Sequence, residues 1–423
     1  MITWPTPQLP QIPGASVDVK IFDSTTQSLV TAAAGPVARI YVCGVTPYDA
    51  THIGHAATYV AFDLLNRAWR DSGLSVQYTS NVTDVDDPLL ERATATGVDW
   101  WELAQDQTAL FAEDMTALGV IPPDTYIGAV ESIPTVAAAI ARMLETGAAY
   151  RVPTDASEMV DDFDLGDVYA DLSVDPAFGS VSHFNHEDQL RFFGERGGDP
   201  ARTGKRNALD PLLWRRARTG EPAWDGGVLG TGRPGWHIEC AVISELGLGD
   251  HIDVQGGGTD LLFPHHEMST SHVRVLSGDP AAGAANHMHA GLVSYQGAKM
   301  SKSLGNLVFV SKLRAQGINP MVIRLALLSQ HYRSEWEWTD ALLDAAQDRY
   351  DRWLDALSGN GGPAPEVALS QIRAAIANDL DAPAALEAVD AWAELAVTDG
   401  YEPVEGAPGV IARAVNALLG IRL

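Results

Sequence analysis

The chain is organised around the stretch Cys43-Gly44-Val45-Thr46-Pro47-Tyr48-Asp49-Ala50-Thr51-His52-Ile53-Gly54-His55. An apolar run at 38–42 precedes it and predicts a buried strand, and apolar residues at helical spacing between Tyr59 and Trp69 predict a helix after it. The stretch therefore lies at the carboxyl end of a strand, where open parallel sheets bind ligands. Its histidines, His52 and His55, can donate hydrogen bonds to phosphate oxygens. Two ordinary surface histidines would give the same short pattern.

A basic loop far downstream, Lys299-Met300-Ser301-Lys302-Ser303, gives this stretch a partner. A solvated charged turn is the structural alternative, but two lysines on a small-residue loop also suit a developing polyphosphate charge, which requires preorganised cations. In this order the two stretches resemble the HIGH and KMSKS motifs of class I aminoacyl-tRNA synthetases. The resemblance implies that both motifs bind ATP and that the loop stabilises the phosphates as pyrophosphate leaves. It implies catalytic roles for His52, His55, Lys299 and Lys302.

Further segments resemble the cysteinyl-tRNA synthetase branch of that class. They are residues 81–87, 235–240 and 256–267. In that branch a zinc ion holds the thiolate of the substrate cysteine. Its protein ligands correspond to Cys43, Cys240 and His265, together with a glutamate four residues after the histidine. Here that last position is Ser269.

The serine changes the expected metal chemistry. Three protein ligands and one open position are typical of a reactive zinc site, whereas four closed ligands suit a structural one. Zinc prefers a soft thiolate to a hydroxyl. We therefore expect one zinc ion per chain, bound by Cys43, Cys240 and His265, with the substrate sulfur as fourth ligand. Glu267 is an alternative ligand, and buried free thiols or a disulfide are the structural alternative for the two cysteines.

The resemblance also implies where ATP, with Mg²⁺, and the cysteinyl adenylate bind. Trp236 precedes Cys240 by four residues, so both face one side of a helix, and the indole could pack over the substrate ammonium or simply lie in the core. The expected contacts are Cys43, Gly44, Val45, Thr46, Thr58, Asn81, Val82, Thr83, Trp236, Gly258, Thr259, Asp260, Leu292, Lys299, Met300, Ser301, Lys302 and Ser303. His287 and His289, on a strand expected at 287–293, receive no role.

The resemblance implies an α/β fold, with a class I synthetase-like Rossmann catalytic core, a connective insertion and a C-terminal helical bundle. A length of 423 residues allows two to three domains. The expected segments are an irregular lead-in (1–35) with a short edge pair, the first half of the core (36–118), the insertion (119–207), the second half of the core (208–297), a KMSKS-loop and stem-contact segment (298–338) and the bundle (339–423). In the bundle, helices are expected near 365–378, 382–397 and 408–419, after a linker at 358–363.

Composition bears on partners and location. The net charge of −27, from 28 basic and 55 acidic residues, argues against a nucleic-acid partner, which would need lysine and arginine opposite its phosphates. Basic clusters occur only at 204–207 and 214–218. Two cysteines give no disulfide framework, and the start of the chain has no signal-peptide pattern. We expect a cytoplasmic monomer without membrane contact.

The remaining question is the acceptor of the activated cysteine. The reading Cys-Gly-Val-Thr-Pro-Tyr-Asp at 43–49, Ser269, the segment 195–200 (Glu-Arg-Gly-Gly-Asp-Pro) and a short acidic tail resemble the cysteine ligases of mycothiol biosynthesis. That resemblance implies an ATP-dependent, AMP-forming carbon–nitrogen ligase that joins L-cysteine to the amine of 1D-myo-inositol 2-amino-2-deoxy-α-D-glucopyranoside. The alternatives are a cysteinyl-tRNA synthetase and, more distantly, an inactive zinc-binding paralogue. Segment 195–200 is either a plain turn or an acceptor contact.

Overall fold

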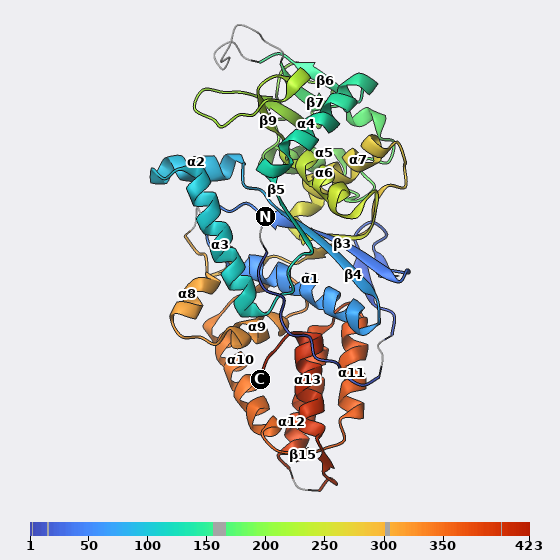
Figure 1. Ribbon diagram of the computed structural model, residues 1–423, viewed down its shortest axis with the longest axis vertical. Coiled ribbons are helices and arrows are strands. Elements are labelled where there is room, and N and C mark those ends of the chain that lie inside the picture. Colours follow the sequence, from blue (N-terminus) through green and yellow to red (C-terminus); the bar gives the residue numbers. More distant parts are fainter. Residues whose placement is uncertain (2, 15–16, 155–165, 301–304, 399) are drawn as a thin grey trace.

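A five-stranded parallel sheet forms the middle of the molecule (Figure 1). The computed structural model describes residues 1, 3–14, 17–154, 166–300, 305–398 and 400–423. The sheet has the order β11-β10-β3-β4-β5, and every neighbouring pair in it is parallel. Its strands are β3 (Val37–Val45), β4 (Ser75–Val82), β5 (Thr125–Gly128), β10 (His251–Gly258) and β11 (Gly283–Ala290).

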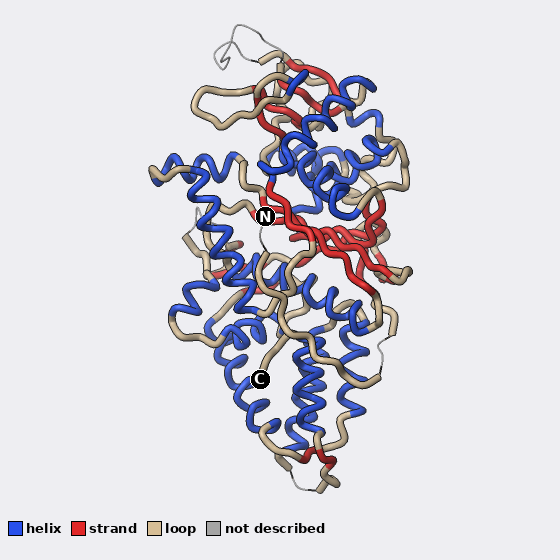
Figure 2. Tube along the Cα trace, in the orientation of Figure 1, coloured by secondary structure: helices blue, strands red, loops and turns tan. Residues whose placement is uncertain are grey.

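Helices cover both faces of this sheet, which explains why β3 is apolar along most of its length (Figure 2). Helix α1 (Ile53–Asp71) follows β3 on one face, and α6 (Trp236–Leu248) packs against β3 and β4 from the other. Helices α4 (Ala129–Thr146) and α7 (Glu267–Ser277) also pack on strands of this sheet, whereas α2 (Asp87–Thr96) packs on α3 (Trp100–Leu118). This doubly wound arrangement is the Rossmann-type core expected from the sequence.

The connective region forms a separate four-stranded antiparallel sheet at one end of the molecule (Figure 1). Its strands are β6 (Ala149–Val152), β7 (Asp167–Ala170), β8 (Leu212–Arg216) and β9 (Gly232–Pro234), with α5 (His186–Glu195) between β7 and β8. Two segments therefore lie across the boundaries that we expected from the sequence. Strand β5 falls in the expected insertion but belongs to the central sheet, whereas β8 and β9 fall in the expected core but belong to the insertion sheet.

The opposite end of the molecule is helical (Figure 1). The bundle contains α10 (Asp340–Leu357), α11 (Glu366–Ala377), α12 (Ala382–Ala396) and α13 (Ala407–Leu419), so each helix predicted in the tail is present. Between core and bundle lie a small sheet, with β12 (Val293–Tyr295), β13 (Ala298–Lys299) and β14 (Trp336–Glu337), and helices α8 (Val310–Ala315) and α9 (Pro320–Leu328).

Buried arginines attach the bundle to the core. Arg67 of α1 and Arg324 of α9 share the buried carboxylate of Asp63. Arg67 also donates to the carbonyl of Asn416, and Arg324 to that of Leu419 at 2.6 Å. Both carbonyls belong to the last turn of α13, where carbonyl groups run out of partners within the helix, and that of Asn416 also accepts from the N–H of the C-cap residue Gly420. The bundle is therefore joined to the helix that carries the first motif.

The expected lead-in packs on the core at Trp4, which is buried and donates from its indole to the carbonyl of Val120. Within it, the expected edge pair is present as β1 (Lys20–Asp23) and β2 (Ser28–Thr31). The strand expected at 287–293 is divided between β11 and β12. The expected linker contains β15 (Gly361–Gly362), which pairs with β16 (Val404–Glu405). Among the described residues, no helix combines the length and apolar character needed to cross a membrane.

Candidate active site

A cavity of about 390 Å³ opens at the carboxyl ends of β3, β10 and β11, beside the first turn of α1. The structure brings both ends of the first motif to this cavity, with Cys43 at one side and the two histidines at another. Eleven of the residues predicted to contact ATP, adenylate or metal, or to act in catalysis, line it. They are Cys43, Gly44, Val45, Thr46, His52, His55, Thr58, Gly258, Asp260, Leu292 and Met300.

Other predicted contacts do not line the cavity. Asn81, Val82 and Thr83 are buried behind it, and Thr259 donates its hydroxyl to the carbonyl of Ala290. Asn81 instead holds the wall in place, because its side-chain oxygen accepts from the backbone N–H of Gly44 at 2.8 Å. A Cβ at Gly44 would lie 1.6 Å from the carbonyl oxygen of Asn81, so only glycine fits this approach of β3 to β4. Asn81, which the resemblance implies as an adenylate contact, therefore supports the wall of the cavity in this structure.

The histidines of the first motif form the N-terminus of α1. His52 is its N-cap, and its Nδ1 accepts from the backbone N–H groups of Gly54 at 3.1 Å and His55 at 3.4 Å. The neutral ring therefore carries its proton on Nε2, an assignment that follows from this network. The His55 ring stacks on that of His52 with centroids 3.7 Å apart, and burial lowers the pKa of His55 to about 4. Both rings can act as neutral donors beside a helix N-terminus, which favours anions.

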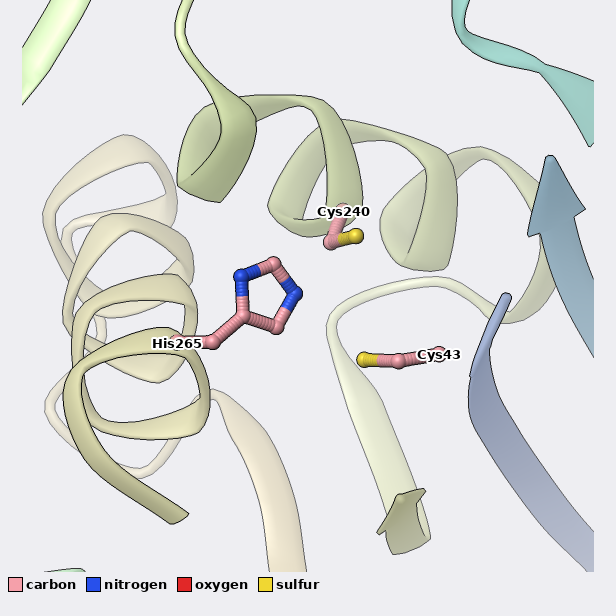
Figure 3. A group of neighbouring side chains, drawn as sticks. All are labelled: Cys43, Cys240 and His265. Atoms are coloured by element: carbon pink, nitrogen blue, oxygen red, sulfur yellow. The ribbon is translucent and has the colours of Figure 1, made fainter. Parts of the chain in front are cut away.

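The predicted metal ligands converge at the bottom of the site (Figure 3). Cys43 comes from β3, Cys240 from α6 and His265 from the irregular turn Leu262–His266. All three are buried, and one donor atom from each lies within 4.8 Å of the others. Both cysteines are free, so the disulfide alternative is wrong.

The residues present fit a zinc ion. His265 Nε2 is buried and has no hydrogen-bond partner in the described part of the chain, whereas its Nδ1 lies 3.0 Å from Nδ1 of His237. A buried nitrogen without a partner is expensive unless a ligand takes it. The neighbouring Cys43 thiol, followed by burial, raises the pKa of Cys240 well above its usual value. A bound cation would remove that effect, because coordinated thiols are deprotonated.

Glu267 and Ser269 are the two polar residues after His265 that bear on a fourth metal ligand, and both make other contacts. The carboxylate of Glu267 accepts from the backbone N–H groups of Gly179 and Ser182, both at 2.8 Å, and it is not part of the metal-ligand group. The alternative that Glu267 replaces the missing ligand is therefore wrong in this structure. Ser269 accepts from Nε2 of Gln255 at 3.1 Å, and the same amide lies 3.8 Å from Sγ of Cys43.

Two predicted neighbours of the substrate lie against the metal-ligand turn. Trp236 stacks on the ring of His265, with centroids 4.1 Å apart, and shares α6 with Cys240 as expected. Arg196, in segment 195–200, donates from Nη1 to the carbonyl of Asp260 at 2.6 Å and also to that of Phe263. The segment therefore clamps the turn that carries Asp260 and His265.

The second motif is described only at its start. Met300 is buried and lines the cavity, whereas Ser301, Lys302 and Ser303 and the side chain of Lys299 lie outside the described residues. The chain after the loop is joined to the first motif, because the backbone N–H of Ile53 donates to the carbonyl of Val308 at 2.8 Å. The structure thus places the described ends of both motifs next to each other.

Sequence reasoning missed several residues of the site. Tyr48, Gly291 and Val293 line the cavity, and His266, His237 and Gln255 surround the candidate metal ligands. Tyr48 lies in the first motif, and His237 and His266 lie in the segments 235–240 and 256–267, so the family resemblance could have pointed to each of them. Gln255 had no signal in the sequence, because only the pairing of β10 with β3 brings its amide to Cys43.

Comparisons with known proteins agree with this geometry. The family model for the catalytic domain of class I (C) tRNA synthetases matches residues 30–348. A protein of Sanguibacter keddieii named L-cysteine:1D-myo-inositol 2-amino-2-deoxy-alpha-D-glucopyranoside ligase is 67% identical over 425 residues, which cover 100% of both chains. Proteins with the same name from Cellulomonas flavigena and Streptomyces coelicolor are 62% and 56% identical, again over 100% of both chains.

Solved structures give the same fold at low identity. A Mycobacterium tuberculosis methionyl-tRNA synthetase in complex with methionyl-adenylate has a TM-score of 0.62 at 16% identity, over 91% of this chain and 88% of that one. The LeuRS of Agrobacterium radiobacter in a ternary complex has a TM-score of 0.58 at 14% identity, over 91% and 83%. The chain therefore belongs to the class I (C) tRNA synthetase family and, within it, to the group of L-cysteine:1D-myo-inositol 2-amino-2-deoxy-alpha-D-glucopyranoside ligases.

Proposed function

We propose that this protein is an ATP-dependent ligase that activates L-cysteine as cysteinyl adenylate and transfers it to the amine of 1D-myo-inositol 2-amino-2-deoxy-α-D-glucopyranoside. The observation that carries the proposal is the full-length identity of 67% to a ligase with that name. The site supports it, because the cavity runs from Cys43, one of the three candidate metal ligands, to the N-terminus of α1, and Cys240 and His265 lie buried beside Cys43.

Cysteine is recognised at the metal end of the cavity. Cys43, Cys240 and His265 would hold one zinc ion per chain, which supplies a bond to a soft thiolate that serine cannot match. Because Ser269 replaces a fourth protein ligand, the open position is left for the substrate sulfur. The carboxylate of the bound cysteine then extends into the cavity toward the helix terminus.

ATP is bound at the other end. The N-terminus of α1 and the neutral donors His52 and His55 face its phosphates, and Lys299 and Lys302 supply positive charge as pyrophosphate forms, with Mg²⁺ as the expected companion. A cysteine carboxylate oxygen attacks the α-phosphorus, and the bond to the β-phosphate oxygen breaks. The products are cysteinyl adenylate and pyrophosphate.

The acceptor amine completes the reaction. Its nitrogen attacks the acyl carbon of the adenylate, the bond to the phosphate oxygen breaks, and AMP leaves while the nitrogen loses a proton. The products are an amide and AMP. A small acceptor is also favoured by the basic clusters, because Lys205, Arg215 and Arg218 form ion pairs with Asp199, Glu221 and Asp167 instead of presenting free charge to phosphates.

A side-by-side acceptor assay tests this function. The protein receives cysteine and ATP with either the amino-sugar inositol or tRNA for cysteine, and AMP release and coupled product are measured. We expect amide with the amino sugar and no aminoacylated tRNA. Aminoacylated tRNA alone would establish the synthetase alternative, and no cysteine-dependent ATP–pyrophosphate exchange would revive the inactive paralogue.

Location, oligomeric state and metal content are separate parts of the proposal. Two buried free thiols fit a reducing compartment such as the cytoplasm. We propose a monomer that contains one zinc ion and needs no nucleic acid. Light scattering of the purified protein tests the oligomeric state, and elemental analysis tests the metal content.

A further inference from the structure

The turn between β1 and β2 packs against the strand β11, which carries two buried histidines. The backbone N–H of Ser24 donates to the carbonyl of His287 at 2.9 Å, and the N–H of His287 donates to the buried carboxylate of Asp23 at 2.8 Å. Because residues two apart on a strand face the same side, His287 and His289 both point from β11 toward this turn. Each ring meets one hydroxyl of the turn.

One chain of hydrogen bonds runs from the turn to a metal ligand. Ser24 Oγ lies 2.8 Å from Nδ1 of His289, whose Nε2 lies 2.8 Å from Nδ1 of His266. His266 Nε2 lies 3.3 Å from Sγ of Cys43. Both rings are buried, whereas Ser24 is half-buried, so the chain connects the bottom of the site to the surface.

Proton counting gives this chain one direction. A metal-bound thiolate only accepts, so Nε2 of His266 must carry the proton, and its Nδ1 must accept in a neutral ring. His289 then donates from Nε2 and accepts at Nδ1, so the hydroxyl of Ser24 donates. Burial lowers the pKa of His289 to about 3, which keeps that ring neutral.

A second chain follows the same logic. Thr25 Oγ1 lies 2.9 Å from Nδ1 of His287, whose Nε2 lies 2.9 Å from Oγ1 of Thr270. Thr270 donates to the side-chain oxygen of Gln255 at 3.2 Å. That bond turns the amide nitrogen of Gln255 toward Ser269 and Cys43, the contacts described above.

We propose that Ser24 and Thr25 are positioning residues of the metal centre, whose hydroxyls fix the tautomers of His289 and His287. Through these rings they hold N–H donors of His266 and Gln255 against Sγ of Cys43. The inference rests on the zinc site of the proposed function and adds the N-terminal hairpin to its outer shell. Outer-shell partners orient ligands and tune the donor strength of the ligand atoms.

The consequence is a weaker metal site when a hydroxyl is removed. Without Ser24, Nδ1 of His289 is a buried acceptor with no donor, so the tautomer of this ring is no longer fixed, and in the other tautomer Nε2 accepts instead of donating. His266 must then also change tautomer, and its Nε2 lone pair would face the thiolate. We expect a tenfold loss of zinc affinity, the lower end of the roughly 10–100-fold range for outer-shell changes.

Zinc affinity and a cobalt spectrum test the proposal in the full-length protein. Zinc dissociation constants are measured by competition with a chromophoric chelator for Ser24→Ala, Thr25→Ala and their double variant. Cobalt(II) replaces zinc in parallel, because its thiolate charge-transfer band reports on the Cys43 and Cys240 sulfurs. We expect weaker zinc binding and a shifted band in each alanine variant, and the largest change in the double variant.

Matched variants separate positioning from general damage. Ser24→Thr keeps the hydroxyl and should restore the wild-type values. Ser28→Ala removes an exposed hydroxyl of the same hairpin that bonds only to Thr26 Oγ1 within the described network, and it should have no effect. Alanine variants with wild-type affinity and cobalt spectrum would overturn the inference. Wild-type protein that binds neither metal would overturn the metal site itself. If Ser24→Ala fails to fold, Thr25→Ala decides the inference, and wild-type zinc affinity together with a wild-type cobalt spectrum in that variant would overturn it.

Discussion

The two ends of the cavity are built in different ways. At the end proposed to bind phosphate (the phosphate end), one short stretch supplies the helix N-terminus, its cap His52 and the stacked ring of His55, and the contacts run between near neighbours in sequence. At the end proposed to bind zinc (the metal end), Cys43, Cys240 and His265 come from three elements that only the parallel order of the sheet brings together. The first end is a property of local structure, and the second is a property of topology.

This difference determines how each end should fail. When one residue of a local site is substituted, only the function of that side chain should be lost, because the helix keeps the neighbouring residues in place. A site assembled from distant elements loses its ligand as a whole, because no remaining pair of donors can hold the ion in the same geometry. The substitutions below test this contrast, beginning with the largest expected effect.

Cys43→Ala should remove bound zinc and adenylate formation together. The residue belongs to the candidate metal-binding group and also lines the cavity, so under the proposed function the substrate thiolate would lose its anchor and the carboxylate its position. Loss of positioning alone costs at least about 100-fold in rate. Elemental analysis and cysteine-dependent ATP–pyrophosphate exchange measure the two effects. Unchanged zinc content and exchange in this variant would contradict the site.

Gly44→Ala should damage the cavity wall that β3 and β4 form at Gly44 and Asn81. The new Cβ would meet the backbone carbonyl of Asn81, which cannot move without separating β3 from β4. We expect a loss of about 3 kcal/mol in the free energy of unfolding, near the upper end for overpacking. Urea unfolding measures it, and Gly73→Ala, at a position with open space but positive φ, is the control for backbone strain alone. Equal losses in both variants would show that the close approach is unimportant.

The sequence contained enough to predict the elements of the core and the three residues, Cys43, Cys240 and His265, that converge into a candidate metal-binding group. Strand β3, helix α1 and the four tail helices have periodic apolar patterns, and the metal ligands lie in motifs that resemble a known family. These features depend on local pattern or on the motifs. These features can therefore be predicted without knowing which strands are neighbours in the sheet.

The parts that could not be predicted are contacts between side chains and distant backbone or rings. Trp4 donates to the carbonyl of Val120, and Arg196 donates to that of Asp260. No periodic pattern in the sequence predicts either hydrogen bond. The resemblance implies that Asn81 contacts the adenylate, which stays a prediction, but the bond from the backbone N–H of Gly44 to its side-chain oxygen had no signal in the sequence. The partner of a polar side chain follows from packing, which a single sequence does not specify.

His55 makes stability at the phosphate end depend on pH. Its folded-state pKa of about 4 lies below the usual value of 6.5, so the unfolded chain binds more protons between these values. Stability from this group is complete above pH 6.5 and is lost as the pH falls toward 4, at about 1.4 kcal/mol per pH unit. His55→Gln should reduce the pH slope of the unfolding free energy by one proton. An unchanged slope would mean that the ring is not buried neutral.

His52 allows a cap and a phosphate donor to be separated by a matched pair of variants. His52→Ala removes the acceptor for the N–H groups of Gly54 and His55, and it should cost about 1 kcal/mol in stability and also raise the KM for ATP. His52→Asn restores a side-chain acceptor at the N-cap, since asparagine is among the preferred residues there, but it supplies no imidazole.

The pair therefore gives a direct test of local construction at this end. We expect His52→Asn to recover the unfolding free energy measured in urea while the KM for ATP stays raised, because the cap depends only on an acceptor beside the helix and phosphate binding depends on the ring. Zinc content should equal that of the wild type in both variants, since no metal ligand lies on α1. Loss of zinc on substitution of His52 would show that the two ends are assembled as one unit, and the contrast between a local and a topological site would then not hold.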